Sequence, residues 1–236
     1  TGVETCALPI SSGLSVVPAD RARSLPDTVE LALGATLGVP AVTAAYCLAG
    51  NQSSVDRTVL VHGGAGGVGR CAIQLAKASG ATVVASASSP AKAAIATAAG
   101  ADLVVNYRDP SAADMILSSV GAVDRIVEVN LPTNLDLDIQ VSRVGTVVVV
   151  YAADGEDPIL PRRQLMTAGL TLQFMLLYSL PQQELLRAVA TVERALADGH
   201  LTMPPVEFFP SDHVVAAHQA DRKSTRLNSS HQIISY

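Results

Sequence analysis

Tryptophan is absent from this chain of 236 residues, and aromatic residues make up only 3% of it. A surface that stacks nucleic-acid bases needs aromatic side chains, so no such surface is expected. Positive charge is also scarce, because the formal net charge is −5. Phosphate backbones are bound by basic faces, so nucleic acid is excluded as a main partner.

Cysteine occurs three times, at Cys6, Cys47 and Cys71, and no two of these residues form a Cys-x-x-Cys pair. An odd number of widely spaced cysteines predicts neither a disulfide framework nor a structural zinc site. His213 and His218 lie five residues apart in the sequence and far from Cys6, so they add no cluster of ligands. We therefore expect no bound metal, and small buried thiols at Cys47 and Cys71.

Long apolar runs and secretion signals are missing as well. No uncharged apolar run is expected to reach the roughly 18–20 residues that a membrane-spanning helix needs, and no signal peptide is visible. The expected location is cytoplasmic, with no membrane partner. The chain is instead rich in core-forming residues: 49% are hydrophobic and the mean hydropathy is +0.34. Its length allows one large domain or two small ones.

The two ends differ in composition from the middle. Residues 221–236 are rich in serine, arginine and asparagine, and residues 1–12 lack periodicity. Both segments resemble peptides translated from sequencing-adapter DNA. We expect residues 1–12 to be a non-native leader and residues 221–236 a non-native tail, with ordinary flexible termini as the alternative.

Six apolar, β-branched runs recur at intervals of 21 to 24 residues. Their continuous apolar character is typical of strands covered on both faces, as in a parallel sheet. Alanine-rich helical stretches separate them, with Pro90 at a helix start and Gly80 and Gly100 at helix ends. The predicted fold class is α/β, a doubly wound (Rossmann) six-stranded parallel sheet. The expected strands are 58–62, 82–86, 103–107, 125–129, 146–151 and 170–178.

Helical patterns flank the expected sheet. Residues 26–50 read as a helical approach that Pro40 interrupts. Residues 181–200 carry apolar side chains on one face, as an amphipathic helix packed on a sheet does.

The segment from Gly64 to Gly69, Gly-Ala-Gly-Gly-Val-Gly, fits the pattern G-x-G-x-x-G. It follows a strand and opens a helix, which is the context that the dinucleotide-binding fingerprint requires. Gly64 is expected to permit the tight turn, Gly66 to let a pyrophosphate approach, and Gly69 to let the helix pack closely. The unpaired amides and the dipole of that helix favour a negatively charged ligand.

The end of the second strand indicates which dinucleotide binds. NAD enzymes place a carboxylate about 20 residues beyond the glycines, where it holds the ribose 2′-hydroxyl. This chain has SASSPAK there, with hydroxyls at Ser88 and Ser89 and a positive charge at Lys92. Tyr107 and Arg108 end the third strand and lie beside the same position. Hydroxyls and cations bind a 2′-phosphate that a carboxylate would repel, so NADP(H) is favoured over NAD(H).

The glycine loop, the segment GVPAVTAAYCL and the segment GADLVVNYRD together resemble the medium-chain dehydrogenase/reductase superfamily. Within it they are similar to the zeta-crystallin type of NADPH:quinone oxidoreductases, whose loop reads HGASGGVG where this chain has HGGAGGVG. The resemblance covers roughly residues 14–220. It implies hydride transfer from NADPH to a quinone or an α,β-unsaturated carbonyl (an enone), and a homodimer joined through strand six.

By position, the resemblance implies cofactor contacts in three groups. The pyrophosphate would meet Ala65, Gly66, Gly67 and Val68. The 2′-phosphate end would meet Ser88, Lys92 and Tyr107. The nicotinamide half would be lined by Thr43, Asn134, Tyr151, Ala152, Phe174, Met175 and Leu176. No catalytic residue is assigned, and His62 is expected to pack or to brace the loop.

The resemblance also predicts domain limits. Family members begin with a GroES-like domain, of which this chain keeps only the end, so we expect a fragment that is inactive or weakly active. Residues 13–50 would be the end of that domain and the lead-in helix, 51–200 the NADP-binding Rossmann domain, and 201–220 the return toward the GroES-like domain. Zinc-type alcohol dehydrogenase and enoyl reductase stay open as alternatives, as does a non-enzymatic NADPH-binding protein.

Overall fold

The computed structural model describes residues 23, 25–27, 29–49, 57–153, 157–202, 206–210, 213, 215–217, 219, 220 and 232–235. Its helices are α1 (Leu31–Leu48), α2 (Gly67–Ala78), α3 (Pro90–Ala98), α4 (Ala112–Val120), α5 (Leu131–Val141), α6 (Arg162–Ala168) and α7 (Gln182–Ala197), with a short 3₁₀ turn η4 (Leu177–Ser179). Its strands are β1 (Thr58–Val61), β2 (Thr82–Ala87), β3 (Leu103–Asn106), β4 (Val123–Glu128), β5 (Ser142–Val150), β6 (Thr171–Phe174), β7 (Val206–Phe209) and β8 (Gln232–Ser235).

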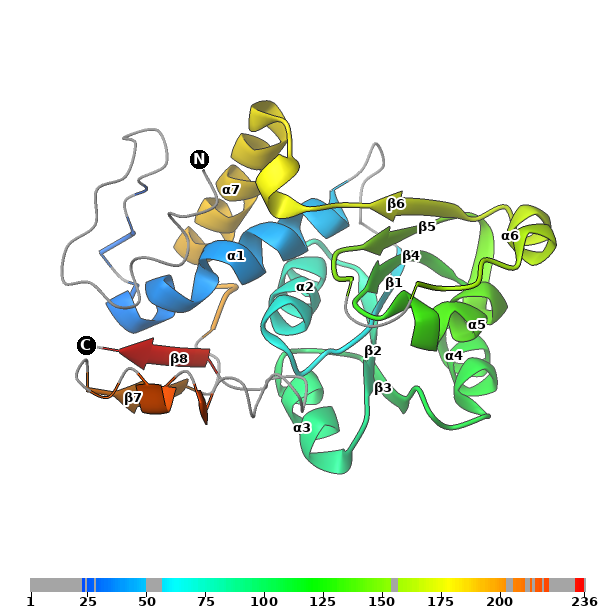
Figure 1. The fold of residues 1–236 in the computed structure, drawn as a ribbon, viewed down its shortest axis with the longest axis horizontal. Coiled ribbons are helices and arrows are strands. Elements are labelled where there is room, and N and C mark those ends of the chain that lie inside the picture. Colours follow the sequence, from blue (N-terminus) through cyan, green and yellow to red (C-terminus); the bar gives the residue numbers. More distant parts are fainter. Residues whose placement is uncertain are drawn as a thin grey trace.

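Six strands form one parallel sheet in the order β3-β2-β1-β4-β5-β6 (Figure 1). The chain winds outward from β1 to one edge of the sheet, returns beside β1 at β4, and winds to the other edge. The predicted doubly wound α/β fold is confirmed. The chain changes direction between β1 and β4, and in sheets of this kind ligands bind outside the carboxyl ends of the strands at such a point.

Alternate side chains of each strand enter two apolar cores. Val59, Val83 and Val127 face a core shared with α1, α2 and α7. Leu60 and Ile126 face a second core shared with α4 and α5. Figure 1 shows these two groups of helices on opposite sides of the sheet. Burial on both faces explains why the sequence shows continuous apolar runs.

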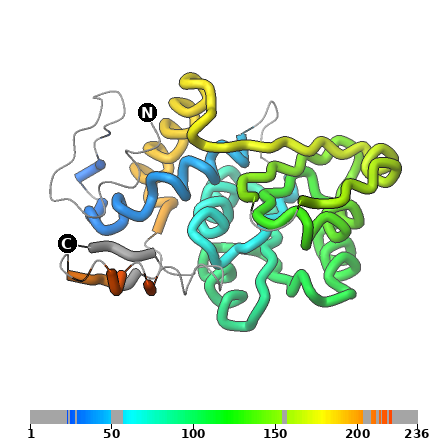
Figure 2. The backbone as a smooth tube through the Cα atoms, viewed as in Figure 1, coloured from blue at the N-terminus to red at the C-terminus, as the bar shows by residue number. Residues whose placement is uncertain are grey.

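Helix α1 corrects two expectations: the interruption at Pro40, and the absence of an apolar run of membrane-spanning length. It runs without interruption through Pro40, because one missing amide is tolerated where a helix is held by packing. It lies beside α2 and α7 (Figures 1 and 2). In the described part of the chain, α1 is also the one helix long and apolar enough to cross a membrane by length and composition. Its buried residues, such as Leu37 and Ala41, belong to the core, which accounts for that composition.

All six strands appear with shifted ends, and two boundaries differ most from the sequence prediction. Strand six was expected to reach residue 178, but β6 ends at Phe174 and η4 follows. Leu177 and Leu180 are apolar because they pack against the core shared with α1 and α7. Strand β5 begins earlier than expected, at Ser142, where an irregular register with β4 is bridged by a bond from Thr146 Oγ1 to the carbonyl of Val123.

A second, small sheet pairs β7 in parallel with β8. β8 lies within residues 221–236, the segment interpreted from the sequence as a non-native tail, and it contacts α1. The expected leader at residues 1–12, the first ten residues of the segment 13–50, and the rest of the tail lie outside the described residues. The domain limits stay predictions.

Candidate functional site

The glycine loop joins β1 to α2 at the centre of the sheet. Gly63 takes the left-handed conformation (φ 65°), and its carbonyl accepts a bond from the amide of Gly66 at 2.9 Å. The amide of Gly64 donates to the carbonyl of Ser86 in β2 at 3.1 Å. The tight turn was expected at Gly64, but the residue whose backbone requires glycine there is Gly63.

Two further glycines are required by close packing. A Cβ at Gly64 would lie 2.8 Å from the Cβ of Ala85, so any side chain there would push the loop away from β2. A Cβ at Gly69 would overlap the carbonyl oxygen of Gly63 and lie 2.9 Å from the Cα of Gly64. The role expected for Gly69, close packing of the helix, agrees with this geometry.

The loop leaves the N-terminus of α2 open to a ligand. No side chain caps this helix, and no acidic residue lies in its first turn. The amides of Val68 and Gly69 have no acceptor within the helix. Their partial positive charge, added to the helix dipole, favours an anion such as a phosphate beside Gly66 and Gly67.

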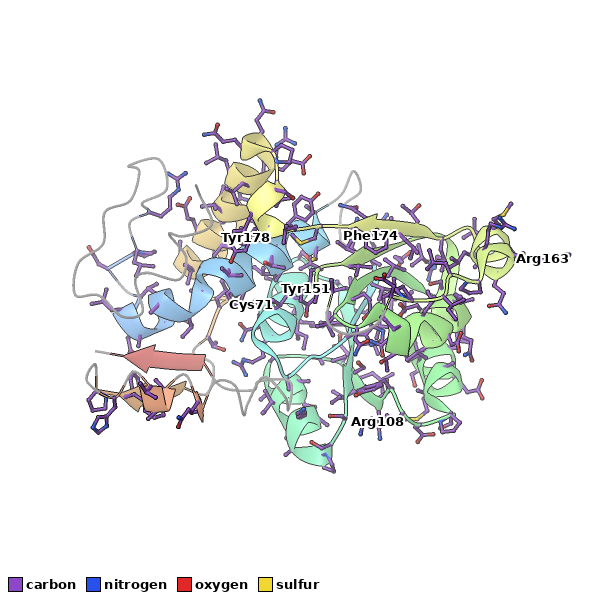
Figure 3. The ribbon with its side chains drawn as sticks, viewed as in Figure 1. Cys71, Arg108, Tyr151, Arg163, Phe174 and Tyr178 are labelled. Atoms are coloured by element: carbon purple, nitrogen blue, oxygen red, sulfur yellow. The ribbon has the colours of Figure 1, made fainter. Side chains whose placement is uncertain are left out.

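The ends of β2 and β3 bring a group of cations and hydroxyls together. Lys92 Nζ lies 3.4 Å from Ser88 Oγ, and the Arg108 guanidinium lies 5.4 Å from the centre of the Tyr107 ring. Figure 3 shows Arg108 near α3. Burial, and then the positive charge of Arg108, lower the pKa of Lys92. Two cations close enough to repel each other form a place where an anion would be stabilised.

The residues expected at the nicotinamide half follow or end β4, β5 and β6, except Thr43, which lies on α1. Tyr151 follows β5, and its amide donates to the carbonyl of Glu128 at 3.1 Å. Burial raises the pKa of Tyr151, with a smaller contribution from the thiol of Cys47. Three members of the set, Asn134, Thr43 and Met175, are buried, while Ala152 is half-buried and Phe174 and Leu176 are exposed. Their contact with a cofactor stays a prediction.

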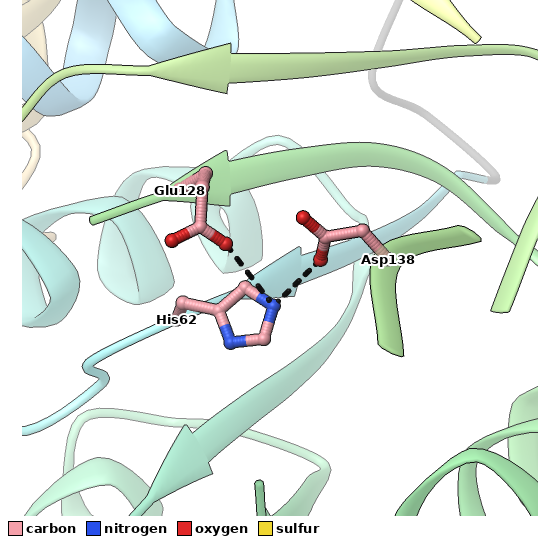
Figure 4. Close-up of side chains that lie close together, drawn as sticks. All are labelled: His62, Glu128 and Asp138. Carbon is pink, nitrogen blue, oxygen red and sulfur yellow. Dashed lines mark hydrogen bonds and ion pairs between the residues drawn. The ribbon is translucent and has the colours of Figure 1, made fainter. Parts of the chain in front are cut away.

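A buried polar cluster forms around His62, the residue that directly precedes the glycine loop (Figure 4). His62 Nε2 lies 2.9 Å from Asp138 Oδ1 and 3.5 Å from Glu128 Oε2, and none of the three side chains is exposed. His62 Nδ1 lies 2.8 Å from Ser86 Oγ. The histidine thus connects the end of β1 to β2 and to α5. It is packed in the interior, and a role in bracing the loop stays a prediction. The carboxylates were missed, although Glu128 is a charged residue inside an apolar strand.

Charge and burial compete in this cluster. The pKa of Glu128 is raised to about 7: burial is the largest cause, His62 opposes it, and the negative charge of Asp138 adds to it. Burial disfavours the charged form of His62, but the carboxylates of Glu128 and Asp138 outweigh it and raise the pKa of the imidazole. The ionisation of His62 and that of Glu128 therefore depend on each other.

The same three residues are the one group in the described part of the chain whose ligand atoms lie close enough to hold a metal ion. They do not fit a catalytic zinc. Such a zinc keeps one coordination position open to water or substrate, whereas these side chains are fully buried. They are also bonded to one another and to Asn134 and Ser86. We therefore assign the cluster to hydrogen bonding.

Comparisons with known proteins agree with this geometry. The family described as zinc-binding dehydrogenase matches residues 67–194. A quinone oxidoreductase of Sus scrofa is 31% identical over 205 residues, which cover 85% of this chain and 61% of the relative. This chain therefore spans less than two thirds of that relative's length.

Solved structures show the same fold. A mycobacterial protein crystallised with NADPH superposes with a TM-score of 0.75 at 26% identity, covering 86% of this chain and 66% of that one. A quinone oxidoreductase of Pseudomonas syringae superposes with a TM-score of 0.78 at 24% identity, covering 92% of this chain and 69% of that one. At 24% identity, the similarity to the Pseudomonas syringae protein is evidence for the fold alone.

Proposed function

We propose, because the chain belongs to the zinc-binding dehydrogenase family, that it binds NADP(H) and forms the cofactor-binding part of a reductase. In the whole protein, a hydride would pass from NADPH to a quinone or an α,β-unsaturated carbonyl. Both substrate classes carry a conjugated, electron-poor system that accepts a hydride. The name of the Sus scrofa relative supports the quinone.

One observation carries the proposal. The glycine loop opens the uncapped helix α2 at the point where the strand order reverses. No side chain caps the backbone amides there, so they can meet a ligand directly. In this proposal Ala65, Gly66, Gly67 and Val68 hold the pyrophosphate.

The preference for NADP(H) rests on the ends of β2 and β3. Ser88 and Lys92, with Tyr107 and Arg108, would surround the 2′-phosphate, and the segment SASSPAK offers no carboxylate to repel it. The mycobacterial neighbour, whose structure contains NADPH, supports this choice. The nicotinamide supplies the hydride, while the chain supplies position and electrostatics. The residues proposed for that half are Thr43, Asn134, Tyr151, Ala152, Phe174, Met175 and Leu176.

We also propose a homodimer joined through β6. This strand is an edge of the sheet, and Phe174 on it is 64% exposed. An uncovered edge with an apolar side chain invites pairing with another strand. The predicted strand had nine residues, but β6 has four, so few backbone bonds can form between two copies. In this proposal the apolar contact therefore contributes more to the pairing than the backbone bonds do.

Calorimetric titration of the chain with NADPH and with NADH tests the cofactor directly. We expect NADPH to bind more tightly. Equal affinities would contradict the assignment of the 2′-phosphate site, and no binding of either would contradict the proposal as a whole. An assay of NADPH oxidation with 1,4-benzoquinone tests the substrate class: oxidation above the rate without protein is the supporting result.

A further inference from the structure

Glu128 holds the side chain of Asn134 in one orientation. Its carboxylate accepts bonds from Asn134 Nδ2 at 2.9 Å to Oε1 and 3.2 Å to Oε2. It also accepts a bond from the backbone amide of Asn130, at the turn between β4 and α5. Both side chains are buried. An ionised carboxylate can only accept, so the NH₂ group of the amide must face it.

The other half of that amide is left without a partner. Asn134 Oδ1 is buried and accepts no hydrogen bond from any described residue. Asn134 lies near the start of α5, which follows β4, and β4 is the neighbour of β1 in the sheet. A buried acceptor without a donor is costly, so an acceptor at this place points to a ligand that donates to it.

We infer that Glu128 is a positioning residue: by accepting from Asn134 Nδ2 it directs Oδ1 toward a hydroxyl or amide donor on the nicotinamide half of the cofactor. The inference rests on the proposed binding of NADP(H). Glu128 touches no reacting atom itself and acts through Asn134.

The orientation depends on the charge of Glu128. A protonated carboxyl can donate to Oδ1, which lets the amide of Asn134 reverse and present its own NH₂ group to the ligand's donor. Two donors then face each other, and binding weakens. The titratable groups that face Glu128 are His62 after β1, Asp138 on α5 and Tyr151 after β5. Besides burial, His62 and Asp138 are the charged groups that shift its pKa. With the pKa of Glu128 near 7, the change falls within an accessible pH range.

The test is calorimetric titration of the wild-type chain with NADPH and with NADH between about pH 5.5 and pH 8.5. Both cofactors are needed because a 2′-phosphate itself ionises near pH 6, which affects NADPH alone. We expect the affinity for both to fall about tenfold toward low pH, since one hydrogen bond is lost. Glu128→Gln should bind both about tenfold more weakly at pH 8.5, with a flat profile. Asp136→Asn, which removes an exposed carboxylate from the same helix, should behave like wild type.

A wild-type profile that is flat for NADH would overturn the inference, as would a Glu128→Gln variant that keeps the wild-type affinity and slope. In either case binding itself survives, and with it the proposed function. Failure of wild type to bind either cofactor would overturn both. If Glu128→Gln does not fold, Asn134→Ala takes its place, with weak and pH-independent binding expected.

Discussion

The imidazole Nε2 of His62 lies 2.9 Å from Oδ1 of Asp138, although 76 residues separate them in the sequence. The contact joins the end of β1, just before the glycine loop, to α5, and Glu128 completes the group from β4. The raised pKa values of Glu128 and His62 in this buried group make the stability of the fold depend on pH.

We expect the free energy of unfolding to fall as pH rises from about 5 to 8. The pKa of Glu128 is raised from 4.5 to about 7 in the folded chain, so the native state binds a proton more tightly than the unfolded state between these values. Stability therefore declines as pH rises through that window. The raised pKa of His62 acts in the same direction, because its stabilising charge is lost as pH rises. The slope is up to about 1.4 kcal/mol per pH unit for each proton.

Urea unfolding of wild type and Glu128→Gln at pH 5, 6, 7 and 8 measures this slope. The variant cannot titrate at position 128, and His62 loses a neighbouring negative charge, so its decline should be smaller than that of wild type. Parallel curves for the two proteins would show that the cluster does not carry the pH dependence.

Gly69→Ala should destabilise the fold by about 1–3 kcal/mol, the usual cost of forcing a group into a packed site. The added methyl group would overlap the backbone of Gly63 and separate α2 from the loop. Gly38→Ala is the matched control, because a Cβ in the middle of α1 meets nothing within 4 Å. That change should stabilise the helix by about 0.5–1 kcal/mol. Thermal unfolding of the two variants compares them, and similar shifts would refute the packing argument.

The sheet could be predicted because its signals are local. Continuous apolar runs of valine and leucine, separated by Pro90 and by glycines at helix ends, carry the period of a βα repeat, and the expected strands appear in the structure. The predicted membership of the dehydrogenase family is confirmed as well. The glycine loop predicted the class of ligand because its motif is contiguous in the sequence. The tight turn was expected at Gly64, whereas Gly63, one residue earlier, takes the left-handed conformation.

The buried cluster could not be predicted in the same way. His62, Glu128 and Asp138 come from three elements, and only the strand order and the register of β1 with β4 bring them together. In the sequence, Asp138 cannot be told apart from an acidic residue on the exposed face of a helix. Its contact with His62 becomes apparent only when α5 packs on the sheet. The predicted end of strand six was wrong for a related reason. Leu177 and Leu180 look like strand residues in the sequence, but their apolar side chains pack on the core shared with α1.

Phe174→Lys should convert the proposed dimer to a monomer. The change places a positive charge on the exposed edge strand, which is a common obstacle to edge-to-edge pairing. Light scattering at micromolar concentration should give twice 24.3 kDa for wild type and 24.3 kDa for the variant. Met115→Lys, which adds the same charge on the partly exposed face of α4, should remain dimeric. A monomeric wild type would contradict the proposal.

Lys92→Ala should weaken the binding of NADPH and leave that of NADH nearly unchanged. Lys92 Nζ lies beside Ser88 Oγ, and the nearby Arg108 already disfavours its charge, so an arriving phosphate would gain from both cations. Loss of one charge-assisted contact corresponds to about 1–3 kcal/mol in NADPH binding. Arg187→Ala removes an exposed positive charge from α7, on another element, and controls for the change in net charge. Calorimetry on the wild type and the two variants measures the affinity for each cofactor. NADH has no 2′-phosphate, so an equal loss of affinity for NADPH and NADH would contradict the prediction. Lys92 would then support the fold or bind the part that the two dinucleotides share.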